Sequence, residues 1–600
     1  MAEASDYPPI GDYALIADSN SAALVSREGS VDWCCIKRMD AGSCFGRLLD
    51  RERGGYCSIA PEDGGPISTS RRYLDDTLVL ETTLRTGGGE ARILDCFTMP
   101  ASMEDYPYRQ LLRVVEGVSG HVGLRFEIAP RFDYGGLMPW IRQEGVRRYS
   151  AIGGDDALLI CSDAGLAPVG EYELEGSVSV HSGERVRLSM VSVPPERLDY
   201  DPPETLDSGE LDRRLRETTE WWRNWSSRIR CEGAHRAGVL RSAITLKALT
   251  NERTGAIAAA PTTSLPERPG GELNWDYRYS WIRDSFFSVR AMAEIGFVAE
   301  AEGFRRFIER SAAGSADELQ IMYGVGGERR LTEETLDYLE GYRGARPVRV
   351  GNAAAGQLQL GMYGQMLDLS WRWQQRGNSP DDDYWRFLLG IVERASQLWN
   401  EPDSGLWEVR GDPRHFVHSK VICWVALDRG LRLSEACMRR APVERWEKTR
   451  DEIRSAIERE GYDEERGTFV QSFGSKELDA ALLLLPTVGF IDYKDERMVR
   501  TADAIREDLD DDGLLKRYRG DAGAFLACSF WLVECLAYQD RHEEARQAFD
   551  RTLATGNDLG LFSEMHDTQK NEPLGNFPQG LSHLSYINAA LALADAPGNG

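Results

Sequence analysis

Residues 403–408, DSGLWE, place a carboxylate beside an indole in a loop between two long helical patterns. The apolar neighbour disfavours the ionised form of Glu408, so its proton is retained to higher pH and it can act as a general acid. Alone, such a glutamate is more often an ordinary surface residue. Other segments with unusual composition are therefore needed to choose between these interpretations.

Residues 274–284, NWDYRYSWIRD, contain four charged and four aromatic residues in eleven positions. Carbohydrate is bound by aromatic rings against its C–H faces and by carboxylate or guanidinium groups on its hydroxyls. The adjacent Arg283 and Asp284 could bind two neighbouring hydroxyls of one sugar. Alternatively, Asp284 favours a helix N-terminus and pairs with the arginine. This segment alone leaves both interpretations open.

Two later segments carry further candidates. Glu564, in SEMHD at 563–567, could be a base that activates water, or a cap or loop carboxylate. Arg517 and Arg519, in KRYRGD at 516–521, could contact sugar hydroxyls or only balance an acidic chain.

An acidic group and two histidines complete the candidates. The acidic group has the spacing of a solvated helical turn, which is favoured over catalysis; it comprises Glu333, Glu334, Asp337 and Glu340. His566 and His583 lack metal-ligand spacing, so no metal site is predicted.

Composition limits the classes of function. Six hundred residues predict two or more domains. The net charge of −26 argues against binding to nucleic acid or an anionic membrane. The N-terminus lacks the pattern of a secretory signal, no apolar run approaches the roughly 20 residues of a membrane span, and the eleven cysteines are scattered. A cytoplasmic location with reduced thiols is predicted.

Two periodicities divide the chain. Residues 1–205 predict an antiparallel β-sandwich, from short runs at 13–17, 23–25, 30–36, 77–84, 111–117, 122–128 and 185–193. Residues 206–230 predict a linker helix whose tryptophans, at 221, 222 and 225, serve packing rather than ligand binding.

Residues 231–600 predict twelve helices, which suggest an (α/α)6 barrel with six inner and six outer helices. If consecutive helices run up and down, the loops from odd to even helices open at one mouth and bring the candidate segments together. The helices are expected to begin near His235, Arg283, Ala299, Ala353, Asp382, Val417, Leu433, Lys476, Glu496, Ala522, His542 and Gln579.

These motifs together resemble family 15 glycoside hydrolases over nearly the whole chain. The resemblance rests on the DYRYSWIRD segment, the LWE segment, the R-Y pair at 517–518 and the SEMHD segment, in the family's order. It implies a β-sandwich followed by an (α/α)6 barrel that hydrolyses an α-glucosidic bond with inversion, without a metal or cofactor. It also implies that Glu408 is the general acid and Glu564 the general base, in a pocket lined by Tyr277, Trp281, Arg283, Asp284, Trp407 and Arg517.

One departure bears on the substrate. Val409 stands where fungal glucoamylases have a second glutamate directly after the acid. Together with the expected cytoplasmic location, this favours a small disaccharide, with α,α-trehalose first and maltose, isomaltose or short maltodextrins next. The sequence leaves open a homo-oligomer, a non-hydrolytic carbohydrate-binding protein and a phosphorolytic enzyme on a related barrel.

Overall fold

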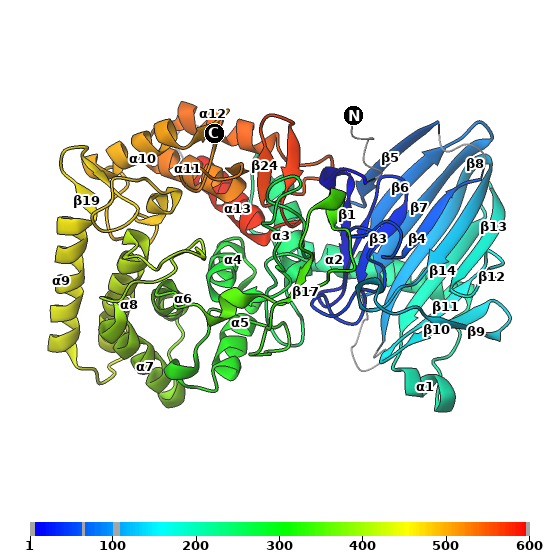
Figure 1. Ribbon diagram of the computed structural model, residues 1–600, viewed down its shortest axis with the longest axis horizontal. Helices are drawn as coiled ribbons and strands as arrows, with labels where there is room; N and C mark the ends of the chain where they lie inside the picture. Colours follow the sequence, from blue (N-terminus) through cyan, green and yellow to red (C-terminus); the bar gives the residue numbers. More distant parts are fainter. Residues whose placement is uncertain (1–6, 63–66, 100–107, 596–600) are drawn as a thin grey trace.

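The computed structural model describes residues 7–62, 67–99 and 108–595. A β-rich N-terminal part lies beside a ring of helices formed by the rest of the chain (Figure 1). In the described residues, no helix combines the length and apolarity needed to cross a bilayer.

The N-terminal part is an antiparallel sandwich whose two sheets share one long strand, β8 (Arg109–Ala129). The second half of β8 joins a sheet of β1 (Ala14–Ala17), β2 (Ala22–Val25), β3 (Ser30–Cys35), β4 (Tyr56–Pro61), β12 (Ala167–Val169) and β13 (Glu173–His181). Its first half joins β5 (Ser68–Tyr73), β6 (Leu80–Arg85), β7 (Gly89–Phe97), β9 (Trp140–Gly145), β10 (Arg148–Gly153), β11 (Asp156–Ser162) and β14 (Arg185–Ser192). The separate strands expected at 111–117 and 122–128 are therefore one strand, and the predicted sandwich is confirmed.

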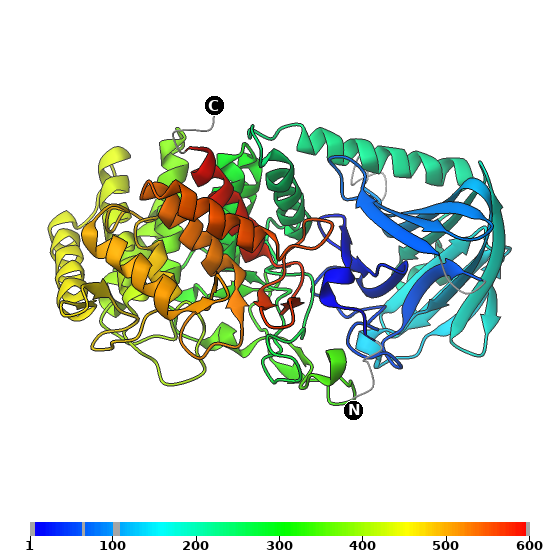
Figure 2. The ribbon, with the colours of Figure 1, turned by 90° about the horizontal axis from the view of Figure 1, so that it is seen from above.

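The predicted linker helix is α2 (Ser208–Ser226), which follows the short α1 (Pro195–Tyr200) and lies along the outside of the sandwich (Figure 2). Asp207 caps its first turn by accepting from the backbone N–H of Glu210. Leu211 and Leu215 pack against side chains of β7 and β8. Trp225 stacks on Phe297 at 4.0 Å, so these tryptophans serve packing, as expected. The boundaries at residues 205 and 230 stay predictions.

The helical part alternates outer and inner helices around a ring. The outer helices are α3 (Arg236–Leu249), α5 (Val298–Ser311), α7 (Asp382–Leu398), α9 (Val443–Glu460), α10 (Glu496–Asp508) and α12 (His542–Leu553). The inner elements contact one another in a closed cycle and are α4 (Ile282–Glu294), α6 (Gly361–Gln375), α8 (Val417–Ala436), the 3₁₀ segment η6 (Ala480–Leu484), α11 (Leu526–Tyr538) and α13 (Gly580–Ala594). This arrangement confirms the expected α/α barrel.

Three predicted helix starts were wrong, although the alternation was right. The helix expected at Ala353 begins at Gly361, after a 3₁₀ turn. Leu433, where another helix was expected to begin, lies inside α8. The prediction failed because α8 is buried on nearly all sides, so its sequence lacks an amphipathic period that would mark its end. The helix expected at Lys476 is only η6, which Asp479 caps and which ends just before Pro486.

The acidic group does not form a helical turn, because Glu334 lies in a strand and Asp337 in a reverse turn. Glu334 belongs to β17 (Glu334–Thr335), which pairs with β18 (Arg349–Val350). The expected helical turn at these residues is therefore wrong.

Candidate active site

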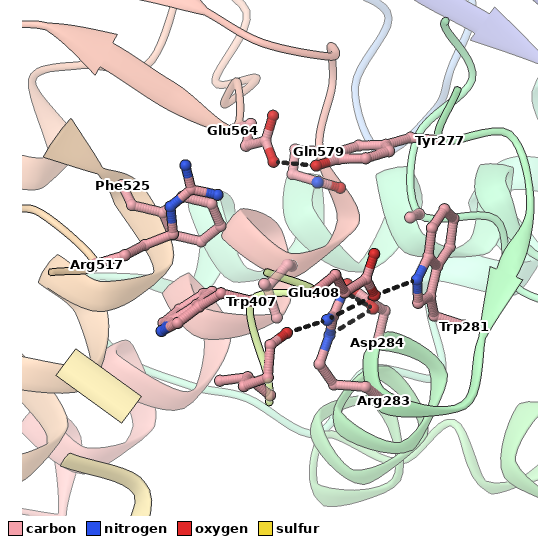
Figure 3. Close-up of a pocket in the computed structure, with 13 residues that line it drawn as sticks. Tyr277, Trp281, Arg283, Asp284, Trp407, Glu408, Arg517, Phe525, Glu564 and Gln579 are labelled. Carbon is pink, nitrogen blue, oxygen red and sulfur yellow. Dashed lines mark hydrogen bonds and ion pairs between the residues drawn. The ribbon is translucent and has the colours of Figure 1, made fainter. Parts of the chain in front are cut away.

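A cavity of about 410 Å³ opens where inner helices begin, and all eight predicted site residues line it (Figure 3). They are Tyr277, Trp281, Arg283, Asp284, Trp407, Glu408, Arg517 and Glu564. The prediction that loops from odd to even helices converge at one mouth is confirmed for these segments.

Glu408 stands at the end of a tight turn, with a backbone φ of +57°. Its Oε1 accepts a hydrogen bond from Trp281 Nε1 at 2.6 Å and one from Arg283 Nη1 at 3.2 Å. Burial raises the pKa of Glu408; the Arg283 charge opposes this rise and the Asp284 charge adds to it. The side chain is therefore held in one orientation while it retains its proton to higher pH than an exposed glutamate.

Arg283 and Asp284 form both the ion pair and the cavity wall that the sequence left as alternatives. Arg283 Nε lies 2.9 Å from Asp284 Oδ2, and Arg283 Nη1 also donates to the backbone oxygen of Leu406 at 2.6 Å. Asp284 occupies the first turn of α4. Arg283 thus ties the α4 terminus to the loop that carries Glu408.

Glu564 faces the same cavity from the residue before β24 (Met565–Asp567), which pairs with β23 (Ala524–Phe525) and β25 (Glu572–Leu574). It is only 2% exposed, and its Oε1 accepts from Tyr277 Oη at 2.8 Å. Its Oε2 has no hydrogen-bond partner among the described protein atoms. Burial raises the pKa of Glu564 to about 8, and the nearby charge of Glu267 adds to this rise.

The segment 274–284 is anchored on the sandwich by residues that alternate with the cavity residues. Arg278 and Asp276 form a buried ion pair at 2.7 Å. Arg278 also donates to Tyr134 Oη and to the backbone oxygen of Ala41, both at 2.7 Å and both in the sandwich. The N-terminal part thereby supports the segment that presents Tyr277 to Glu564.

Trp407 and Arg517 form a second wall, and acidic partners fix both. Trp407 Nε1 donates to Asp479 Oδ1 at 2.8 Å. Arg517 Nε and Nη2 donate to Asp521 at 2.8 Å, and Nη2 also reaches Glu267 Oε2 at 2.6 Å. Arg517 lines the cavity as predicted, but protein carboxylates already hold much of its guanidinium.

Three weaker candidates do not join the cavity. Arg519 is exposed and lies 3.7 Å from Asp508. His583 is buried and bonds Ser242 and the Phe562 backbone, and His566 lies 3.0 Å from Asn571. The described chain contains no cluster of three or more His, Cys, Asp or Glu side chains that could hold a metal.

Sequence reasoning missed four residues that shape the site: Glu267, Asp479, Gly575 and Gln579. Glu267, Gly575 and Gln579 are isolated among loop or apolar residues, so no local pattern marks them. The clearest signal was Asp479, a lone carboxylate inside the apolar run LDAALLLL at 478–485. Gly575 has a φ of +74°, and a Cβ there would lie 2.4 Å from Glu564 Oε2.

Comparison with known proteins identifies the family. Residues 233–591 match the model described as Glycosyl hydrolases family 15, and residues 3–162 match Trehalase-like, N-terminal. The chain is 39% identical to the trehalase of Mycobacterium tuberculosis, covering 98% of this chain and 89% of that one. It is 34% identical to the trehalase of Thermoplasma volcanium, covering 98% and 94%.

The fold has a solved counterpart. A bacterial glucoamylase complexed with acarbose superposes with a TM-score of 0.73 over 99% of this chain and 96% of that one, at 12% identity. At this identity, the likeness concerns the fold alone. The family model and the trehalase relatives, in contrast, show that the chain is a glycoside hydrolase and belongs to family 15 of the glycosyl hydrolases.

Proposed function

We propose that this enzyme hydrolyses α,α-trehalose to two glucose molecules with inversion, with Glu408 as general acid and Glu564 as general base. The main support for the proposal is that the two glutamates Glu408 and Glu564 line one cavity and have different hydrogen-bond partners. The substrate is supported by the relatives named trehalase, which align with almost the whole chain.

The surroundings of Glu408 suit an acid that becomes anionic. Trp281 and Arg283 both donate to Oε1, so the transferable proton resides on Oε2. When that proton passes to the glycosidic oxygen, Oε1 of the resulting carboxylate keeps one cationic donor, Arg283, and one neutral donor, Trp281. Because both donors are already in place, they stabilise the charge without rearrangement.

The surroundings of Glu564 suit a base that receives a proton from water. Tyr277 fixes Oε1, and the buried Oε2 has no partner among the described protein atoms, so Oε2 is the acceptor for a water placed against the sugar. An inverting enzyme needs room for this water, with its carboxyl groups about 6.5–9.5 Å apart. The raised pKa makes Glu564 a stronger base once it is ionised.

The substrate proposal is tested by comparing initial rates on trehalose, maltose and isomaltose, with and without phosphate. We expect the highest kcat/KM on trehalose, with glucose released independently of phosphate. A higher kcat/KM on maltose would make it a glucoamylase-type enzyme. Sugar phosphate as the product would make it a phosphorylase, and saturable binding without turnover would make it a binding protein.

Glu267→Gln is expected to lower the pKa of Glu564 and so to move to lower pH the limb of the kcat/KM profile that Glu564 controls. The negative charge of Glu267 raises the pKa of Glu564, so its removal lets the base ionise at lower pH. The loss also frees Arg517 to act more strongly on Glu564, in the same direction. The matched control is Glu272→Gln, an exposed carboxylate on the same loop. If both limbs stayed in place, or if the limb that moves shifted to higher pH, Glu267 would not act on Glu564 in this way.

Gly575→Ala is expected to lower kcat by about 100-fold, the effect of displacing a catalytic group by about 1 Å. The added Cβ would lie 2.4 Å from Glu564 Oε2 and 2.9 Å from its Cβ, so the base must move. Gly489→Ala is the control for backbone strain, because Gly489 has the same φ of +74° and its Cβ would meet no described atom within 4 Å. Equal kcat values for the two variants would rule out a positioning role for Gly575.

We also propose a cytoplasmic location. All eleven cysteines are free thiols in the described residues, which suits a reducing compartment. Fractionation of the native host would test this.

A further inference from the structure

A second cavity, of about 720 Å³, adjoins the first one and shares four of its residues, Tyr277, Trp407, Glu408 and Arg517. We call the first cavity the inner cavity and the second the outer cavity. Glu564 lines only the inner cavity, whereas Glu408 lines both. On the proposed function, the sugar attacked by water occupies the inner cavity and the leaving sugar occupies the outer one. The oxygen that Glu408 protonates then lies where the two cavities meet.

Arg410, two residues after the acid, lines the outer cavity and is held in one place. Its guanidinium lies 4.0 Å over the Trp275 ring. Its Nη1 and Nη2 donate to the two carboxylate oxygens of Glu333, at 3.2 and 2.7 Å. Glu333 is itself held by the backbone N–H of Ala353 at 3.1 Å.

The support behind Arg410 extends to a second arginine. Arg349 lies 4.4 Å from the same indole and 3.5 Å from Glu333 Oε1, and it donates to the backbone oxygen of Asn274 at 2.9 Å. Trp275 and Glu333 thus have partners other than Arg410. Most exposed ion pairs hold their side chains only loosely, but a two-point carboxylate pair with ring stacking orients the guanidinium of Arg410.

The orientation of Arg410 leaves donors for a ligand. A guanidinium has five N–H donors, and Glu333 takes two of those on Arg410. The neighbouring Val409 also lines the outer cavity but offers no side-chain hydrogen bond. Of the residues of this loop that line the outer cavity, Arg410 is the charged one beyond Glu408, and its remaining donors can bind hydroxyl groups.

We propose that Arg410, oriented by Trp275 and Glu333, binds hydroxyl groups of the leaving glucose. This inference rests on the proposed function. The proposed contact of Arg410 involves the leaving group only. A substrate whose leaving group is not a sugar lacks this contact but still needs attack by water, so it distinguishes the role of Arg410 from that of the general base.

The test compares trehalose with α-glucosyl fluoride, in which fluoride replaces the leaving glucose. In Arg410→Ala, the ratio of kcat/KM for trehalose to kcat/KM for the fluoride should fall by about 10- to 100-fold, as for loss of hydrogen bonds to a charged donor. Arg410→Lys should recover only part of this ratio, because lysine keeps the charge but not the planar fork. Glu333→Gln should lower it less than Arg410→Ala does.

Arg386→Ala is the matched control. Arg386 is an exposed arginine of α7 paired with Asp383 at 2.9 Å, outside both cavities, and its loss should not move the ratio. An unchanged ratio in Arg410→Ala, or equal losses on both substrates, would overturn the role of Arg410. A wild-type enzyme that hydrolyses neither substrate would instead overturn the proposed function and, with it, this inference.

Discussion

Glu408→Gln is expected to lower kcat on trehalose by about 10²–10⁴-fold, the usual contribution of a general acid. A sugar leaves slowly unless its oxygen is protonated, and glutamine cannot supply the proton. The amide oxygen can still accept from Trp281 and Arg283, so the cavity should keep its shape. The measurement is steady-state kinetics on trehalose and on α-glucosyl fluoride.

The fluoride substrate distinguishes the loss of an acid from general damage. Fluoride departs without a proton, so Glu408→Gln should retain a much larger fraction of wild-type kcat on the fluoride than on trehalose. Equal losses on both substrates would contradict the acid role of Glu408 and would indicate either the role of the base or a structural defect. Near wild-type kcat on trehalose would show that Glu408 is not the acid.

Glu564→Gln is expected to lower kcat by a similar or larger factor on both substrates, because water must attack whatever the leaving group. Parallel losses on trehalose and fluoride are thus the signature of the base, and unequal losses are that of the acid. If Glu564→Gln turned over either substrate near the wild-type rate, Glu564 would not be the general base.

The same variant should be more stable than the wild type at neutral and alkaline pH. Between the ordinary glutamate pKa of 4.5 and the folded value of about 8, the folded state binds more protons than the unfolded state. Stability from this carboxyl is therefore present below pH 4.5 and is lost as pH rises toward 8. Glutamine has no such loss, so the difference in Tm should widen from pH 5 to pH 8. A lower Tm for Glu564→Gln at pH 8 would contradict the burial argument.

The site residues could be predicted because they stand in short motifs that resemble those of family 15 and occur in the family's order. Arg283 and Trp407 belong to two of these motifs. Amphipathic outer helices such as α10 alternate with apolar inner ones such as α11, so the barrel could be predicted as well. These signals lie in short stretches of the sequence, so they can be recognised without a structure.

Residues that act through distant partners could not be predicted in this way. Glu267 reaches Arg517 across 250 positions, and Gly575 matters only because Glu564 packs against it. Glu333 was expected on a solvated helical turn, but it holds Arg410 from 77 positions away. In each case, the role of the residue depends on a contact that only the fold creates. Residue type and spacing in the sequence do not predict this contact.

Proton NMR of the first products distinguishes inverting from retaining hydrolysis of trehalose by the pair Glu408 and Glu564. Inversion releases one glucose as the β-anomer from the attacked sugar and one as the α-anomer from the leaving sugar. Before mutarotation, we expect equal amounts of α- and β-glucose. Formation of α-glucose alone would show retention and would exclude an inverting mechanism for Glu408 and Glu564.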